Sequence, residues 1–239
     1  MATVSAPPAR TPSNHWHAAH GARLVDRDGW QVPAVYTDVE RETAAARTGL
    51  GVADVSAFAK TGLLGPGVAE VVPHLVGPGR ADRPCTAAPL HAGSPGLACR
   101  LTADSLLLLA STTDPAPLAA GLRDLRHERP LHRQDETTAR AAFWLVGPHI
   151  EDVLRRLTAV DLDAAVLPMG SCTETSLAGV PALLVTSPEL ALPSLRVCVS
   201  WDLGEYVWEC LLDAGRDLGA QPLGLDTIQE LHAPRHRHG

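Results

Sequence analysis

The chain has 239 residues, of which 45% are hydrophobic and 20% are charged, and its formal net charge at pH 7 is −7. This size and composition are typical of a globular protein with one large or two small cores. The acidic balance argues against a general attraction to nucleic acid or to an anionic membrane surface. No apolar run reaches the roughly 18 residues that a membrane-spanning helix needs, so we expect neither nucleic acid nor membrane as a partner.

The N-terminus and the cysteines indicate a protein of the bacterial cytoplasm. Residues 1–14 are mostly Ala, Pro and polar residues without the apolar segment of a secretion signal, and we predict a flexible tail there. The five cysteines are scattered without a CxxC pair, which favours free thiols in a reducing compartment. Lys60 is the only lysine among many Arg, Ala, Gly and Pro residues, a bias typical of a GC-rich bacterial genome.

The first part of the chain predicts strands and helices with clear punctuation. Strands are predicted at 22–26 and 31–36 around an Asp-Gly turn, and a helix at 39–48 that two glycines end. One long strand is predicted at 52–64, and a Gly-Pro-Gly turn separates it from a short helix at 68–76.

The middle and the end of the chain are less regular. Residues 77–96 are rich in Gly, Pro and Ala, which predicts a long loop. The predicted elements after this loop are a hairpin at 97–101 and 105–110, a helix at 114–126, strands at 182–186 and 195–199, and an amphipathic helix at 202–218.

A weak internal repeat divides the chain. Leu63-Leu64-Gly65-Pro66 recurs as Leu145-Val146-Gly147-Pro148, and each copy joins a strand to an amphipathic helix through a Gly-Pro turn. We therefore predict an α+β fold with two related halves at 15–138 and 139–233, followed by a basic tail at 234–239. The alternative is that strand, Gly-Pro turn and helix form a common arrangement without further meaning.

A polar strip on the predicted strand 52–64 is the first candidate for ligand binding. Asp54 and Ser56 are two residues apart and therefore share one face of a strand, which Phe58 and Lys60 continue. A carboxylate beside a hydroxyl could bind a ligand amine, and it could equally cap the local backbone. Phe58 offers an aromatic wall in a chain with only 4% aromatic residues.

The histidines and cysteines give no metal or nucleophile signature. His15, His17 and His20 lie close together, but no cluster of carboxylates or cysteines accompanies them, so we expect an exposed helix start and no metal. Cys99 alternates with apolar neighbours on a predicted strand and lines either a cavity or the core. Cys198 lies on an apolar face, which favours a buried structural cysteine.

Several segments match, in order, the pattern of one enzyme family. GLGVADVS at 49–56, followed by Lys60 and a Leu-Gly-Pro turn, is similar to the signature GLFDVSHMGK…GP. The segments 145–148, 207–215 and 222–225 resemble LQGP, LWDALLEAG and PAGL. The chain thus resembles the folate-binding aminomethyltransferase family, which includes the T-protein of the glycine cleavage system. The resemblance implies two related halves around a central pocket where tetrahydrofolate accepts a one-carbon unit, normally followed by a C-terminal β-barrel.

The residues that carry the chemistry of that family are replaced in this chain. The catalytic aspartate aligns with Ser94 or Pro95, the pterin-binding glutamate with Arg196, and the arginine of the site with a position near Ile228. Phe58 stands where a methionine packs against the pterin. Because arginine has only hydrogen-bond donors, Arg196 cannot accept the pterin N–H groups. We therefore expect the scaffold without ordinary glycine-cleavage chemistry, and without the β-barrel.

The sequence leaves three functions open. The pocket could be repurposed to bind and convert a non-folate, acidic small molecule in bacterial metabolism, with Arg196 as the anchor. The chain could instead be a non-catalytic folate-fold subunit, similar to those of sarcosine-oxidising complexes, with a protein partner or a second copy on an apolar face. It could also be a tetrahydrofolate-dependent one-carbon transferase with relocated ligands. No catalytic residue is assigned, tetrahydrofolate is the one cofactor that the resemblance offers, and the candidate pocket residues are Tyr36, Asp54, Ser56, Phe58, Cys99 and Arg196.

Overall fold

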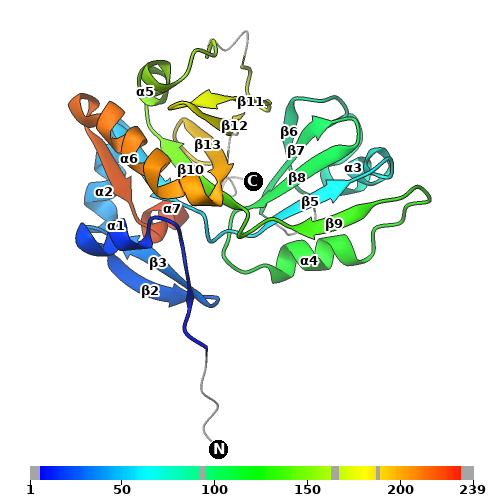
Figure 1. The fold of residues 1–239 in the computed structure, drawn as a ribbon, viewed down its shortest axis with the longest axis horizontal. Helices are drawn as coiled ribbons and strands as arrows, with labels where there is room; N and C mark the ends of the chain where they lie inside the picture. The colour runs from blue at the N-terminus through cyan, green and yellow to red at the C-terminus, as the bar shows by residue number, and fades with distance from the viewer. Residues whose placement is uncertain (1–5, 92–94, 163–166, 187–188, 233–239) are drawn as a thin grey trace, which may run out of the picture.

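Three β-sheets with helices packed around them make up the molecule (Figure 1). The computed structural model describes residues 6–91, 95–162, 167–186 and 189–232. The predicted basic tail at 234–239 and the start of the predicted N-terminal tail, 1–5, lie outside these ranges. Within the described ranges, no helix is long and apolar enough to span a membrane.

The smallest sheet has the order β1-β3-β2 and packs beside a short helix. Its elements are β1 (Ala9–Arg10), α1 (Asn14–Ala19), β2 (Arg23–Arg27) and β3 (Trp30–Val35). The predicted flexible tail extends to residue 14, yet Ala9 pairs with Trp30, and Thr11 and Ser13 are buried. The end of this segment is therefore part of the folded molecule, because β3 offers it a free parallel edge.

The second sheet has six strands in the order β11-β12-β13-β10-β4-β14. Its strands are β4 (Leu50–Asp54), β10 (Arg140–Val146), β11 (Cys172–Leu177), β12 (Val180–Thr186), β13 (Ser194–Ser200) and β14 (Ala220–Leu223). All neighbours are antiparallel except β14 and β4, which are parallel. Strand β4 precedes residue 138 but pairs with β10, so the sheets exchange strands across the division that the sequence suggests.

The third sheet has five antiparallel strands in the order β6-β7-β8-β5-β9. Its strands are β5 (Lys60–Leu64), β6 (Thr86–Pro89), β7 (Gly96–Thr102), β8 (Ser105–Ala110) and β9 (His132–Asp135). The prediction of one strand at 52–64 is wrong, because β4 ends at Asp54 and β5 begins in the other sheet. Residues 55–59 cross between the sheets and are buried throughout, so no exposed turn residue marks the break.

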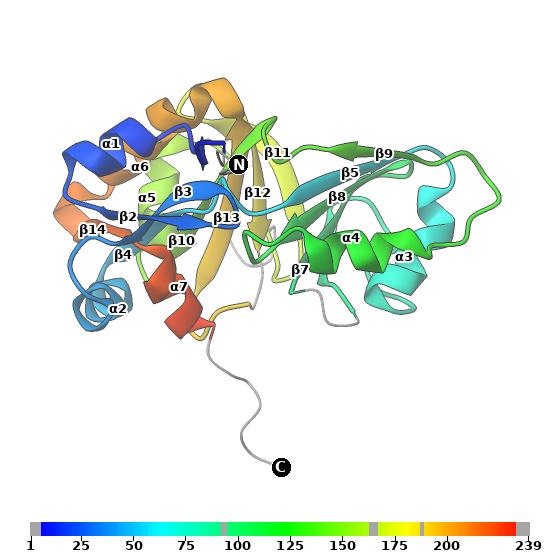
Figure 2. The same ribbon diagram turned by 90° about the horizontal axis from the view of Figure 1, so that it is seen from below.

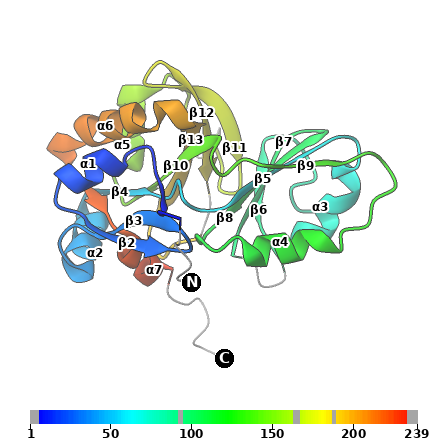
Figure 3. The ribbon, with the colours of Figure 1, turned by 60° about the horizontal axis from the view of Figure 1, so that its bottom comes forward.

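Helices cover the outer faces of both large sheets. Helices α3 (Val68–Val76) and α4 (Ala116–Arg123) share a hydrophobic cluster with the outer face of the five-stranded sheet (Figure 2). Helices α5 (Ile150–Leu157) and α6 (Gly204–Ala214) do the same for the six-stranded sheet (Figure 3). The predicted helix at 202–218 is thus split, with 3₁₀ turns at Trp201–Leu203 and Arg216–Leu218.

The inner faces of the two large sheets share a third hydrophobic cluster. Helices α2 (Val39–Thr48) and α7 (Leu225–Leu231) contribute to it from one end. The two Gly-Pro turns of the sequence repeat adopt matching backbones, with φ of 121° at Gly65 and 129° at Gly147, and each leads from a strand into a helix. The predicted α+β fold with two related halves is confirmed.

Candidate functional site between the two large sheets

Buried side chains from both large sheets meet at the centre of the molecule, where the sheets face each other. Antiparallel register places Trp144 of β10 opposite Arg196 of β13, and Arg196 opposite Val185 of β12. Phe58 and Cys99 from the other side of the interface belong to the same cluster as Trp144. Three of the predicted pocket residues, Phe58, Cys99 and Arg196, therefore meet here.

Arg196 is held by three other residues of this chain through its Nη1 and Nη2. Its Nη1 donates to the carbonyl oxygen of Ala110 at 2.8 Å, and its Nη2 donates to Glu189 Oε1 at 2.7 Å and to the hydroxyl of Ser111. The guanidinium carbon lies 4.0 Å from the centre of the Trp144 ring, a cation–π contact. The side chains of Arg196 and Glu189 are 2% and 8% exposed, so this is a buried ion pair.

Four buried polar atoms in and around this ion pair have no hydrogen-bond partner among the described residues. They are Nε of Arg196, Oε2 of Glu189, Nε1 of Trp144 and Nε2 of His232. The rings of Trp144 and His232 lie 5.0 Å apart, and burial lowers the pKa of His232, which favours its neutral form. Buried polar atoms are rarely left unpaired, so water or a small polar molecule would satisfy this group.

Asp54 and Tyr36 belong to a different network on the outer face of the six-stranded sheet. Asp54 pairs with Phe143, whose ring packs 5.7 Å from that of Trp208 on α6. A hydrogen bond of 2.9 Å joins Asp54 Oδ2 to His17 Nε2, and one of 2.7 Å joins His17 Nδ1 to the Tyr36 hydroxyl. The expectation of an exposed helix start is wrong for His17, which is fully buried.

The Asp54 carboxylate is stabilised by these internal contacts. Burial by itself raises the pKa of Asp54, but the hydrogen bond and charge of His17 and the hydrogen bond of Ser56 outweigh it and hold this pKa below its usual value. Ser56 donates its backbone N–H to Asp54 Oδ1 at 2.9 Å, and its hydroxyl accepts the N–H of Ala142 at 3.0 Å. The backbone-capping alternative is the one that the structure shows. Burial raises the pKa of Tyr36 strongly, with the charge of Asp54 acting in the same direction.

Lys60 is buried with its charge directed at backbone oxygens. Its Nζ donates to the carbonyl oxygens of Ser56 at 2.8 Å and of Phe58 at 2.9 Å. Burial lowers the pKa of Lys60 to about 8, so the ammonium loses its proton more readily than an exposed lysine. These two carbonyls of the crossing 55–59 are thereby satisfied by the lysine at its end.

Two thiols of the inner face, Cys99 and Cys198, have raised pKa values. Burial raises the pKa of Cys198, although the nearby charge of Lys60 opposes it. A hydrogen bond with Cys172 raises the pKa of Cys99 well above its usual value, and burial adds to this shift. Cys99 and Cys198 are fully buried, so we assign neither a nucleophilic role.

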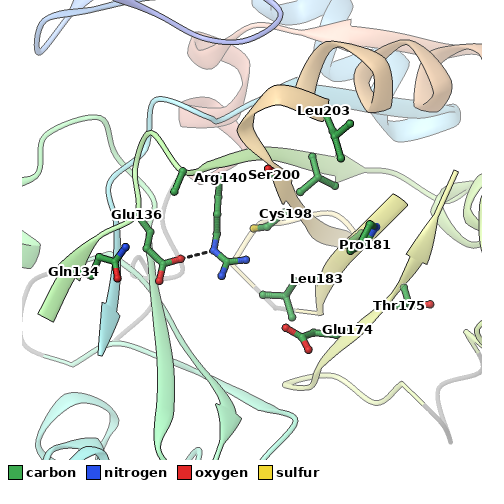
Figure 4. A pocket seen from close by; sticks show the side chains of 13 residues that line it. Gln134, Glu136, Arg140, Glu174, Thr175, Pro181, Leu183, Cys198, Ser200 and Leu203 are labelled. Carbon is green, nitrogen blue, oxygen red and sulfur yellow. Dashed lines mark hydrogen bonds and ion pairs between the residues drawn. The ribbon is translucent and has the colours of Figure 1, made fainter. Parts of the chain in front are cut away.

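An open cavity of about 590 Å³ lies on the same inner face, further along the strands (Figure 4). Arg140 pairs with Ser200 at the end of β10, and on the inner face the next pair along the strands is Ala142 with Cys198. The lining side chains are Gln134, Glu136, Ala139, Arg140, Glu174, Thr175, Pro181, Ala182, Leu183, Cys198, Val199, Ser200 and Leu203. None of the six predicted pocket residues is among them.

The sequence did not identify the residues that pair with Arg196 or those that line the cavity. Glu189 and Trp144 were not identified, because nothing in their local sequence links them to Arg196. The signal that could have found Glu136 and Arg140 is their spacing of four residues, but the two residues lie on opposite sides of the boundary predicted between the halves at residue 138. Among the described residues, no group of three or more His, Cys, Asp or Glu could hold a metal ion.

The positions that align with the chemistry of the resembled family carry no carboxylate at the centre. Ser94 lies outside the described residues. Pro95 lies just before β7, and its carbonyl oxygen accepts the N–H of Ser111 at 3.0 Å. Ile228 is a buried core residue of α7, 1% exposed.

Comparisons with known proteins agree with this architecture. The family model described as "GCVT N-terminal domain" matches residues 13–89 and 92–235. An aminomethyltransferase from Halothermothrix orenii is 27% identical over 231 residues, which are 92% of this chain and 64% of that protein. The sarcosine oxidase subunit alpha of Corynebacterium sp. is 28% identical over 255 residues, which are 95% of this chain and 26% of that protein.

Two solved structures have a similar fold. The glycine cleavage system aminomethyltransferase T from Bartonella henselae superposes with a TM-score of 0.71 at 17% identity, over 94% of this chain and 62% of that chain. A chain of the heterotetrameric sarcosine oxidase from Corynebacterium sp. U-96 gives a TM-score of 0.60 at 23% identity, over 89% of this chain and 97% of that chain. This chain thus spans less than two thirds of the H. orenii relative, and it belongs to the aminomethyltransferase (GCVT) family.

Proposed function

We propose that this chain is a non-catalytic GCVT-fold subunit that acts within a larger protein complex. The observation that carries the proposal is the buried pair of Arg196 and Glu189, which closes the centre with groups of the chain itself. Because Nη1 and Nη2 already donate to Ala110, Ser111 and Glu189, the guanidinium has only Nε and one N–H of Nη1 left for a ligand.

The missing carboxylates support the same proposal. The resembled family positions a folate amine and a pterin edge with acidic groups, and Pro95 and Arg196 stand in their places. Losing one buried, paired group costs on the order of 2–5 kcal/mol of binding free energy, and two such losses remove micromolar affinity. Folate binding at the centre would also require the Arg196–Glu189 pair to separate inside the core.

The comparisons support a role as a subunit. A chain of the heterotetrameric sarcosine oxidase is matched over 97% of its length, so a chain of about this extent occurs there as one component of an assembly. In the subunit alpha of sarcosine oxidase, the similar segment makes up 26% of a much longer protein. We place this chain in a reducing bacterial cytoplasm, which its five free thiols support.

The test has two arms. In the first, the purified protein is titrated calorimetrically with tetrahydrofolate and with its methylene derivative, and we expect no heat of binding up to millimolar ligand. In the second, a tagged chain is purified from its own cells and sized by native mass spectrometry, and we expect a stoichiometric complex with other chains. Micromolar folate binding would restore the one-carbon transferase, and a free monomer in the cell extract would remove the subunit role.

A second candidate is the repurposed pocket, in which an acidic small molecule binds at Arg196. The four unpaired polar atoms around Arg196, Glu189, Trp144 and His232 favour it, because a small polar ligand would satisfy them. An incoming carboxylate would have to displace Glu189. Titration of wild type and of Glu189→Gln with succinate separates the candidates: binding only by the variant supports the closed centre, and binding by both supports the ligand site.

A further inference from the structure

The cavity of about 590 Å³ has the volume of a small-molecule site, and it is lined by an arginine whose outer N–H groups are free. It lies over the inner face of β10, β13, β12 and β11, at the end where β9 and the following loop come across (Figure 4). Volumes of roughly 300–1,000 Å³ are typical of ligand pockets. Along β13, the cavity lies from Cys198 toward Ser200, whereas the closed centre lies at Arg196, two residues before Cys198.

Arg140 presents the free end of its guanidinium to this cavity. Its Nε donates to Glu136 Oε2, and its Nη1 and Nη2 have no partner among the described residues. Figure 4 shows the guanidinium projecting from β10 into the open space. Two free amino groups on one planar guanidinium match the two oxygens of a carboxylate, and a side chain that is 31% exposed strengthens such a pair relative to open water.

Glu136 fixes the direction of this arginine. Its side chain is 13% exposed and lies against β5, where a Cβ added to Gly62 would come within 2.2 Å of Glu136 Oε1. A larger residue at that position would force the carboxylate to move. The guanidinium is therefore held through Nε, and its outer edge is oriented before any ligand arrives.

The far wall of the cavity has the opposite charge. Glu174 is exposed on β11, opposite Leu183 of β12, and no hydrogen bond joins its carboxylate to the described residues. From β10 to β11 there are three strand spacings of about 4.8 Å each, or about 14 Å. Both charged side chains point into the gap, and Leu183 forms its apolar floor between them (Figure 4).

From this arrangement we infer that the cavity binds a short ω-amino acid. Its carboxylate would lie on Nη1 and Nη2 of Arg140, its methylene chain on Leu183, and its ammonium group would face Glu174. An α-amino acid does not fit the pattern, because its two charges are adjacent while those of the cavity stand on opposite walls. A plain carboxylic acid would leave Glu174 without a counter-charge.

Calorimetric titration of the full chain with 5-aminopentanoate and 6-aminohexanoate tests this inference. We expect binding in the range of about 0.1–1 mM, and affinity at least about tenfold weaker for hexanoate and for leucine. Arg140→Gln should abolish binding of both ω-amino acids. Glu174→Gln, a change at an exposed residue, should remove the preference for 6-aminohexanoate over hexanoate and leave hexanoate binding unchanged.

The matched control is Arg155→Gln. Arg155 also pairs with a glutamate four residues before it, but on the exposed surface of α5 and away from the cavity. We expect this variant to bind like wild type. Equal affinity for hexanoate and 6-aminohexanoate, or ω-amino acid binding that survives Arg140→Gln, would overturn the inference. So would the absence of binding heat when either ω-amino acid is titrated to about 10 mM, ten times the weakest expected dissociation constant.

Discussion

Replacing Glu189 by alanine should destabilise the protein far more than the loss of one exposed ion pair. At the Nη2–Oε1 distance of 2.7 Å, the Coulomb attraction in a medium with an effective dielectric constant of about 20 is about 6 kcal/mol. Desolvation of both charges offsets much of this, yet the variant keeps the buried Arg196 without its counter-charge. Removing one partner of a buried pair costs about 3–5 kcal/mol. Because Ala110 and Ser111 still accept hydrogen bonds from Arg196, we expect a cost at the lower end, about 3 kcal/mol.

Urea unfolding followed by tryptophan fluorescence measures this cost. The control is Glu151→Ala, which breaks the exposed pair with Arg155 and should lower the free energy of unfolding by less than about 1 kcal/mol. A Glu189→Leu, Arg196→Met double variant removes both charges and should recover most of the loss. If Glu189→Ala costs no more than the control, Arg196 is not held by Glu189, and the closed centre on which the proposed function rests is refuted.

The buried network and the turns give three further expectations. Folding lowers the pKa of Lys60 to about 8, so between this pH and the ordinary lysine pKa the unfolded chain holds more protons than the folded one. The free energy of unfolding of the wild type, measured relative to that of Lys60→Met, should therefore rise by about 2 kcal/mol from pH 7 to pH 10. A difference in urea midpoints that does not change with pH would contradict this. Gly147→Ala should cost about 3 kcal/mol or prevent folding, because its φ is 129° and a Cβ would lie 2.4 Å from a backbone oxygen beside α2. In the control Gly121→Ala, the Cβ meets nothing within 4 Å and the change is made inside helix α4, so thermal unfolding should occur at or slightly above the wild-type temperature. His17→Ala removes the hydrogen bond that lowers the pKa of Asp54, so the midpoint of acid unfolding, followed by circular dichroism, should move to higher pH; an unchanged midpoint would show that Asp54 does not depend on His17.

Local signals in the sequence are sufficient to locate the strands and helices that begin or end at a tight turn or a helix cap. The hairpin around Asp28-Gly29, the helix ended by Gly49 and the two Gly-Pro turns lie where the sequence predicts them. Each is specified by neighbours along the chain, through a glycine that adopts positive φ or a side chain that caps a helix. The turns at Gly65 and Gly147 repeat in the sequence because both have a positive φ, which favours glycine at each position.

Long-range pairing explains what the sequence does not reveal. The run from Val52 to Leu64 is apolar enough to be one strand, but its two ends pair with β10 and β8 in different sheets. That break separates Asp54 from Lys60 and places Asp54 on the outer face with His17. The family resemblance groups Asp54 with Arg196, and only the register of β10 with β4 and with β13 shows that the two residues face opposite sides of the six-stranded sheet.

Two arginines on one sheet face show why residue type alone could not locate a site. Arg196 and Arg140 lie on neighbouring strands and both face inward, yet the edge of the guanidinium that meets a glutamate differs between them. The carboxylate of Glu189 meets Arg196 at Nη2, the end that would bind a ligand, whereas Glu136 meets Arg140 at Nε and leaves that end free. An arginine whose outer edge is already paired offers fewer donors to an incoming carboxylate than an arginine paired only at Nε. The site of this chain is therefore expected at the rim of the inner face, one step away from the centre that its family resemblance indicates.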